Sequence, residues 1–144
     1  MPTQRVERRT MQRELQVEAA YKQQIAQMNT LHNANPPCPL CIEGSVRVIV
    51  DHFGTMCVIE NDFPYSVFDG VRLQRHLMLI PVRHIALFED FNEQEQRDYW
   101  RALTEYTSEG YNTMTRSTRN FARSVPDHLH THMFLHVDGA EGKQ

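Results

Sequence analysis

Polar and apolar residues alternate strictly near the C-terminal end of this sequence. The odd positions 129–137 carry Leu, Thr, Met, Leu and Val, and the even positions 128–136 carry four histidines and one phenylalanine. Successive side chains of a β-strand point to opposite faces, so this period of two predicts a strand. One face would lie on a core, and the other would carry three consecutive histidines about 6.6–7 Å apart at their Cα atoms. Single histidines often fill half-polar strand positions, but three in register indicate a functional site.

The N-terminal part of the chain has a helical pattern. Residues from about Thr3 to His32 include no Gly or Pro and are rich in helix-forming residues. Apolar residues follow one helical stripe at Val17, Tyr21, Ile25, Met28 and Leu31. We predict one long helix, frayed before about Met11, whose second half packs on another element. Four arginines lie here, Arg5, Arg8, Arg9 and Arg13. We interpret them as part of a solvated face rather than as phosphate ligands.

Short apolar runs predict further strands at Ser45–Val50, Met56–Glu60, Leu77–Ile80 and around Tyr111–Arg116. We expect a turn at 51–54 and a loop at 61–75.

A second helix is expected to begin at Asn92, because Asn92 and Glu95 have the spacing of a capping box. Its predicted inner face carries Tyr99, Trp100, Leu103 and Tyr106, and Gly110 suits its end.

Five strands and one long internal helix predict an α+β fold with an antiparallel sheet. We divide the chain into an N-terminal helical extension (1–35), a main domain (36–138) and a flexible tail (139–144). A length of 144 residues is consistent with one compact domain and an appendage.

Composition narrows the function classes. The formal net charge of −3 argues against a general nucleic-acid binder, and no apolar run is long enough for a membrane span. The charged N-terminus does not resemble a signal peptide. Three cysteines, two of them spaced C-x-x-C, argue against a disulfide framework and predict a cytoplasmic protein. We interpret Cys57 as an ordinary buried thiol.

The segment His128-Leu-His130-Thr-His132-Met-Phe resembles the H-x-H-x-H-x-x signature of the histidine triad (HIT) proteins. A second segment, from His76 through Pro81 to His84, resembles the family's other landmark, a histidine followed by an apolar strand and Pro-x-x-His. The segment Asn61-Asp-Phe-Pro-Tyr65 is similar to the nucleotide phosphorylase and uridylyltransferase-like branches. Together these motifs cover about Cys38 to Val137.

This resemblance implies a HIT-like five-stranded antiparallel sheet, often in a homodimer, and an enzyme that acts on nucleotides. A nucleotide hydrolase or nucleotidyl transferase would attack the α-phosphate of a phosphoramidate or dinucleoside polyphosphate. His130 would be the nucleophile, because a neutral imidazole nitrogen is nucleophilic near neutral pH. The matching positions imply that His132 binds phosphate oxygens, that Ser124 lies near the leaving group and that His76 lies beside the nucleophile. Asn120 is a weaker candidate for a phosphate contact.

Cys38-x-x-Cys41 is half of a tetrahedral zinc site, and no second C-x-x-C exists. In the zinc-bearing branches of the family the remaining ligands correspond to His84 and His128, which implies a closed, structural zinc site. The alternative is a pair of reduced or redox-active thiols. Prolines directly before the motif and Glu-Gly shortly after it do not favour a thioredoxin-like arrangement.

The sequence departs from the family pattern at several points. Thr131 replaces an apolar residue, Arg123-Ser124 replaces Gly-rich sequence, and no Pro-Arg follows the triad. Ten residues separate Tyr65 from His76, more than in most members. Asn61 and Asp69 are therefore no more than candidate ribose ligands.

Two rival functions remain open. One is a metal-hydroxide hydrolase in which all three triad histidines bind a single metal. The other is a non-catalytic nucleotide-binding or regulatory protein with a partner-binding N-terminal helix.

Overall fold

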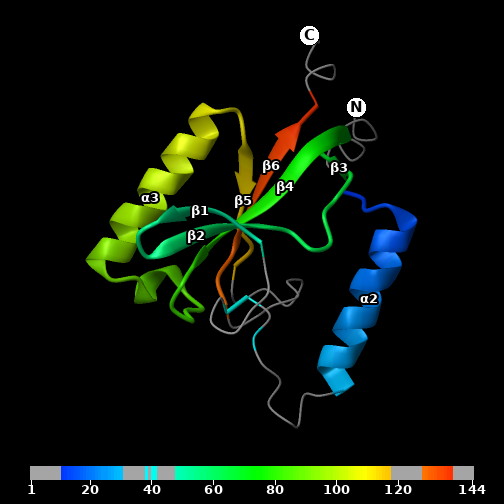
Figure 1. Ribbon diagram of the computed structural model, residues 1–144, viewed down its shortest axis with the longest axis horizontal. Helices are drawn as coiled ribbons and strands as arrows, with labels where there is room; N and C mark the ends of the chain where they lie inside the picture. The colour runs from blue at the N-terminus through cyan, green and yellow to red at the C-terminus, as the bar shows by residue number, and fades with distance from the viewer. Residues whose placement is uncertain (1–10, 31–37, 39, 42–47, 118–127, 138–144) are drawn as a thin grey trace.

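The computed structural model describes residues 11–30, 38, 40–41, 48–117 and 128–137. Its sheet has the strand order β1-β2-β4-β6-β5, and the short β3 pairs with β4 outside this path. The strands are β1 (Ile49–Phe53), β2 (Met56–Glu60), β3 (Val67–Phe68), β4 (Val71–Pro81), β5 (Asn112–Met114) and β6 (Thr131–His136). All these pairings are antiparallel (Figure 1). The α+β class and the five-stranded antiparallel path predicted from the sequence are confirmed.

The centre of the sheet is the pair β4 and β6. His76 of β4 lies opposite Phe134 of β6, and Met78 lies opposite His132. Paired residues of neighbouring strands point to the same face, so this register fixes which β4 side chains meet the histidines. The alternation in β6 gives the two faces that the sequence predicts. Leu129, Met133 and Leu135 contact the core cluster on one side, and the histidines lie on the other.

The prediction of a loop over 61–75 was wrong for its second half. Val67–Phe68 and the first part of the long strand β4 form a hairpin there. Its two turn residues, Asp69 and Gly70, have φ values of 56° and 76°. Asp-Gly is a preferred pair for a two-residue hairpin turn, because both positions need positive φ. This hairpin occupies much of the ten-residue interval between Tyr65 and His76.

The predicted turn at 51–54 is also displaced. β1 continues through Phe53, which pairs with Met56 and is buried. The turn is at Gly54, with φ of 62°, and a Cβ at this position would collide with the carboxylate of Asp98. That carboxylate accepts hydrogen bonds from the backbone N–H and the hydroxyl of Thr55, each at 2.8 Å.

Helix α3 (Glu93–Ser108) covers one face of the sheet (Figure 1). Asn92 and Glu95 form the predicted capping box, with both hydrogen bonds present. Ala102 and Tyr106 are buried against the sheet, but Trp100 is 68% exposed, so its predicted place on the inner face was wrong. At about 100° per residue, a position two residues from Ala102 points away from the face on which Ala102 lies.

A smaller apolar cluster lies on the histidine side of the sheet. It contains the buried side chains of Leu40, Cys57, Ile59, Met78 and Ile80. Cys57 is 1% exposed, in agreement with its interpretation as a buried thiol.

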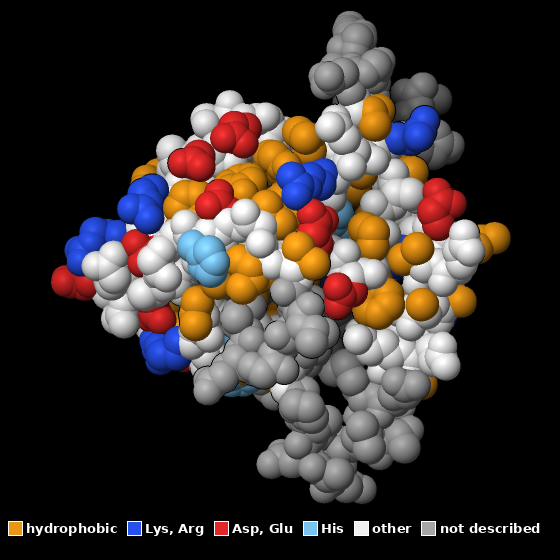
Figure 2. All heavy atoms as spheres, viewed as in Figure 1, with side chains coloured by type: hydrophobic (Ala, Val, Ile, Leu, Met, Phe, Trp, Pro, Cys, Tyr) orange, Lys and Arg blue, Asp and Glu red, His pale blue; other side chains and the backbone are white. Residues whose placement is uncertain are grey.

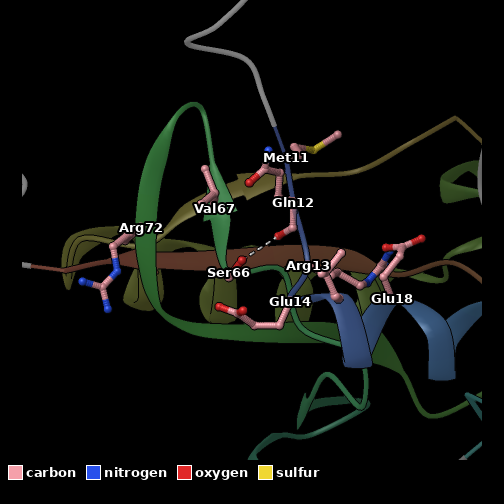
Figure 3. Close-up of a pocket in the computed structure, with 9 residues that line it drawn as sticks. Met11, Gln12, Arg13, Glu14, Glu18, Ser66, Val67 and Arg72 are labelled. Carbon is pink, nitrogen blue, oxygen red and sulfur yellow. Dashed lines mark hydrogen bonds and ion pairs between the residues drawn. The ribbon is translucent and has the colours of Figure 1, made fainter.

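The N-terminal segment adds to the sheet before it becomes helical. Helix α2 (Leu15–Thr30) begins later than the sequence predicts, because Gln12 is extended and forms a β-bridge with Val67. Its backbone N–H donates to the Val67 carbonyl at 3.0 Å, and its carbonyl accepts from the N–H of Ser66 at 2.6 Å. Figure 3 shows the segment beside Ser66 and Val67. Residues 3–10 and 31–32 of the predicted helix lie outside the described residues.

The predicted boundaries at 35/36 and 138/139 and the tail at 139–144 also lie outside the described residues. On the face drawn in Figure 2, basic and acidic side chains are interspersed. Among the described helices none combines the length and apolar character needed to cross a membrane.

Candidate functional site

His128 precedes strand β6 and contacts the C-x-x-C segment. It is fully buried, and its Nε2 lies 3.0 Å from the carbonyl oxygen of Pro81. A carbonyl only accepts, so Nε2 carries the proton and the Nδ1 lone pair is directed elsewhere. Nδ1 lies 3.4 Å from Cys38 Sγ and 3.7 Å from Cys41 Sγ. Burial lowers the pKa of His128, which keeps the imidazole neutral.

Cys38, Cys41, His84 and His128 form a group that can hold a metal ion. Their four ligand atoms all lie within 4.8 Å of one another, and Cys41 Sγ lies 3.2 Å from His84 Nδ1. Zinc bonds of about 2.3 Å to sulfur and 2.0–2.1 Å to nitrogen place S and N about 3.6 Å apart in a tetrahedron. The observed S–N distances fit this geometry. The group therefore brings together all four residues that the sequence proposes as metal ligands.

The chemistry of the donors also fits a metal ion. Burial raises the pKa of the Cys38 thiol to about 11. Without a cation the thiol therefore stays protonated, whereas thiolates are the form that binds zinc. Four protein donors leave no coordination position for a substrate, which is typical of a structural site.

His130 is held by the strand's own backbone. Its Nδ1 lies 3.0 Å from the carbonyl oxygen of His128, and the side chain is 7% exposed. Because the carbonyl accepts, Nδ1 carries the proton and Nε2 carries the lone pair. The same residue, His128, thus contributes a ring nitrogen to the metal group and a carbonyl that fixes the tautomer of His130.

His76 and His132 form a buried relay whose proton positions follow from one backbone donor. The N–H of Tyr65 donates to His76 Nδ1 at 3.0 Å, so the proton of a neutral His76 is on Nε2. His76 Nε2 lies 2.9 Å from His132 Nδ1 and donates to it. His132 therefore keeps its own proton on Nε2, where it can be donated to a ligand.

Both imidazoles of this relay are neutral at physiological pH. Burial is the main cause that lowers the pKa of His76 to about 3, and burial likewise holds the pKa of His132 well below its usual value. The charges of Arg13 and, for His132, Arg116 act in the same direction. The site therefore offers neutral N–H donors rather than imidazolium ions.

Arg13 supports this relay from the N-terminal segment. Its guanidinium carbon lies 3.9 Å from the ring centre of Tyr21 and 4.3 Å from that of Tyr65. Its Nε donates to the carbonyl of Phe63 at 2.6 Å, and it pairs with Glu18 (Figure 3). The side chain is 10% exposed, so its interpretation as part of a solvated face was wrong. No sequence signal distinguishes Arg13 from the three arginines before it.

Aromatic stacking continues this support into the sheet. The ring of Tyr65 stacks on His76 with centres 5.1 Å apart and planes 14° apart. His132 in turn lies parallel to Phe134, with an interplanar angle of 1°. The relay is thus fixed by ring packing as well as by hydrogen bonds.

Thr131 has a polar partner on each side, which accounts for a hydroxyl where the family has an apolar residue. Its Oγ1 lies 2.8 Å from the hydroxyl of Tyr99 and 2.7 Å from that of Thr115. These contacts are on the core face of β6 and connect the triad strand to α3 and to the chain after β5.

The three triad histidines do not converge on one metal ion. Within the described residues, the metal-binding group includes His128 but neither His130 nor His132. The Nδ1 atoms of the latter two face a carbonyl and His76. This geometry argues against the single-metal hydrolase.

Four sequence candidates remain. Ser124 and Asn120 lie in 118–127, outside the described residues. Asp69 occupies the hairpin turn. The Oδ1 of Asn61 accepts from the N–H of Phe63 at 2.7 Å, and its Nδ2 lies 3.3 Å from His76 Nε2, so this side chain borders the relay.

Comparisons with known proteins identify the fold. No model of a known protein family matches the sequence, and no curated protein matches it. Among solved structures, a HIT family hydrolase from Clostridium thermocellum Cth-393 has a TM-score of 0.51 at 20% identity. The match covers 70% of this chain and 89% of that one.

Two further structures are similar at lower TM-scores. A HIT family hydrolase from Legionella pneumophila Philadelphia 1 has 21% identity and a TM-score of 0.48, and covers 74% of this chain and 91% of its own. A histidine triad protein from Clostridium difficile has 14% identity and a TM-score of 0.49, with 70% and 88% covered. From the antiparallel sheet and the Clostridium thermocellum match, the chain is HIT-like in its fold.

Proposed function

We propose that this chain is a nucleotide hydrolase or nucleotidyl transferase that acts at the α-phosphate of a nucleotide conjugate, a phosphoramidate or a dinucleoside polyphosphate. The observation that carries this proposal is the contact between His130 Nδ1 and the His128 carbonyl at 3.0 Å. It leaves the lone pair of a neutral imidazole on Nε2, which is the form needed for attack on phosphorus. The HIT-like fold of the chain and of a solved hydrolase supports the same reaction class.

In the first step the Nε2 lone pair of His130 forms a bond to the α-phosphorus. The bond from phosphorus to the leaving group breaks, and the leaving group keeps its electron pair and takes up a proton from solvent. The proton stays on Nδ1 and remains hydrogen-bonded to the His128 carbonyl, so the nucleotidyl-imidazole carries a positive charge and is labile. In the second step an acceptor, water for a hydrolase, attacks phosphorus and loses a proton. The N–P electron pair returns to Nε2, which restores neutral His130.

The proton on His132 Nε2 gives this residue the role of binding a phosphate oxygen. Negative charge on these oxygens is stabilised by N–H donors that are already in place before the reaction. His76 acts through His132, because its Nε2–H fixes which ring nitrogen of His132 is protonated. His76 is therefore a positioning residue.

A structural zinc ion would be held by Cys38, Cys41, His84 and His128. When bound, it supplies a cross-link rather than a Lewis acid for the reaction, because four protein donors complete a tetrahedron. The cross-link ties the C-x-x-C segment to His128, whose carbonyl orients His130. We also propose a homodimer in the cytoplasm. The family resemblance supports the dimer, and the reduced cysteine pattern supports the compartment.

Paired kinetic and binding measurements on His130→Ala test the proposal. Adenosine 5′-phosphoramidate and diadenosine polyphosphates are the first probes, followed by their uridine and guanosine analogues. We expect His130→Ala to abolish turnover while binding persists. His136→Ala is the matched control, because this histidine lies on the same strand but contacts the Phe68 carbonyl at 2.9 Å. Equal turnover in wild type and His130→Ala, or wild-type binding without turnover, would contradict the enzymatic proposal.

A further inference from the structure

Arg116 follows β5, the strand beside the triad strand, by two residues, at a position that sequence patterns did not single out. β5 pairs with β6 so that Met114 is opposite His132. Side-chain alternation continues past the end of β5, because Thr115 reaches Thr131 on the core face at 2.7 Å. Extending the β5–β6 register by two residues therefore assigns Arg116 to the opposite, histidine-bearing face, at the level of His130.

The positive charge of Arg116 acts on His132. Its guanidinium is one of the groups that lower the pKa of His132, which places the positive charge near the proposed phosphate donor. The side chain is half-buried. Among the described residues, no ion pair joins Arg116 to a carboxylate.

The other arginine near the relay differs in this respect. Arg13 is held by Glu18, by a backbone carbonyl and by two tyrosine rings, so its donors and its charge are largely engaged by the protein. The two relay imidazoles, His76 and His132, are neutral. Among the described arginines near the triad, Arg116 is therefore the one whose charge no ion pair with a described carboxylate engages.

We propose that Arg116 is a substrate-binding residue that contacts the phosphate chain and gives the site a preference for nucleotides with two or more phosphates over those with one. This inference rests on the proposed function, because it assumes that the α-phosphate binds at His130 and His132. A neutral N–H donor such as that of His132 is sufficient to bind a single phosphate that carries one negative charge. A guanidinium adds most where a second phosphate brings further charge, which it can bind through two parallel hydrogen bonds.

Binding of ADP and adenosine 5′-phosphoramidate, measured by calorimetry on the full zinc-loaded chain, tests this preference. Loss of a hydrogen bond to a charged group corresponds to a weakening of about 10- to 150-fold. We expect Arg116→Gln to weaken ADP by about this factor and the phosphoramidate by less than about threefold. Arg116→Lys, which keeps the charge but not the planar fork, should recover part of the ADP affinity. Arg97→Gln, an exposed change on α3, is the matched control and should bind both ligands as wild type does.

Equal weakening of both ligands, unchanged ADP binding in Arg116→Gln, or no ADP binding by the wild type would overturn the assignment. If Arg116→Gln does not fold, Arg116→Lys decides, because its ADP affinity should fall more than its phosphoramidate affinity. The result is separable from the reaction itself. ADP binding that depends on Arg116 without a covalent adduct on His130 would retain Arg116 and reject the proposed chemistry. A covalent adduct on His130 together with ADP binding that does not depend on Arg116 would retain the proposed chemistry and reject the role of Arg116.

Discussion

The substitution His76→Phe removes the hydrogen-bond relay behind His132 while keeping an aromatic ring in the same place. The ring of His76 stacks on Tyr65 and lies 4.6 Å from the ring centre of Phe134, contacts that phenylalanine can keep. The substitution removes the acceptor for the Tyr65 N–H and the donor to His132 Nδ1. It is therefore a test of the relay rather than of core packing.

The expected cost follows from these two hydrogen bonds. A buried polar group left without its partner costs about 1–3 kcal/mol, so two such groups lower the free energy of unfolding by about 2–6 kcal/mol. The effect on the reaction has a different origin. Without His76, nothing described holds the proton of His132 on Nε2, and loss of one donor to a developing oxyanion costs about 10²–10³-fold in kcat. We expect kcat to fall toward this range while KM changes less.

Urea unfolding and steady-state kinetics, measured on the same preparations, check both numbers. His136→Phe is the control, because it replaces a β6 histidine by the same ring and loses contacts only to the Phe68 carbonyl and the Asn112 side chain, neither of which belongs to the relay. It should keep kcat within about threefold, a small change beside the oxyanion-donor effect. A folded His76→Phe protein with wild-type kcat would refute the role of the relay.

Three further predictions concern acid stability, the metal group and the core face of the triad strand. Because the pKa of His76 falls from 6.5 to about 3 on folding, the unfolded chain binds more protons between these values. The free energy of unfolding should then decrease by up to about 1.4 kcal/mol per pH unit as the pH drops through this range, and urea titrations should show a smaller decrease for His76→Phe. Atomic emission should find about one zinc per wild-type chain. Cys38→Ser should lose this zinc and show a lower Tm, whereas Cys57→Ala should show neither change. Wild-type protein that is folded without metal would reject the zinc site. Thr131→Val removes the hydroxyl contacts to Tyr99 and Thr115. It should lower the free energy of unfolding by about 1–3 kcal/mol and leave the zinc content unchanged. Unchanged stability would show that this network contributes nothing.

The sequence predicts well the parts of the fold in which one local pattern decides. Strict alternation placed Leu129 and Met133 in the core and the histidines on the other face, and the capping box placed the start of α3 at Asn92. The C-x-x-C spacing predicted half of the metal group, and the family resemblance added His84 and His128, which the structure brings to the same place. In each case a short-range signal and the tertiary structure agree.

Sequence reasoning failed where long-range contacts override local preference. Gln12 and Arg13 lie in a helical pattern, but backbone pairing with Val67 keeps Gln12 extended and directs Arg13 to the tyrosine rings. Trp100 was assigned to the core on hydrophobicity alone, although the helix approaches the sheet through Ala102. Arg116 shows a third limit, because its relation to His130 depends on a cross-strand register that no local pattern encodes.

The most direct test of the central claim is intact-protein mass spectrometry after the chain is mixed with adenosine 5′-phosphoramidate and quenched at alkaline pH, where a phosphoramidate bond to histidine survives. The account predicts a mass gain of one AMP unit in the wild type, peptide mapping that assigns it to His130, and its absence in His130→Ala. Turnover without any adduct, or an adduct that persists in His130→Ala, would contradict the assignment of His130 Nε2 as the nucleophile.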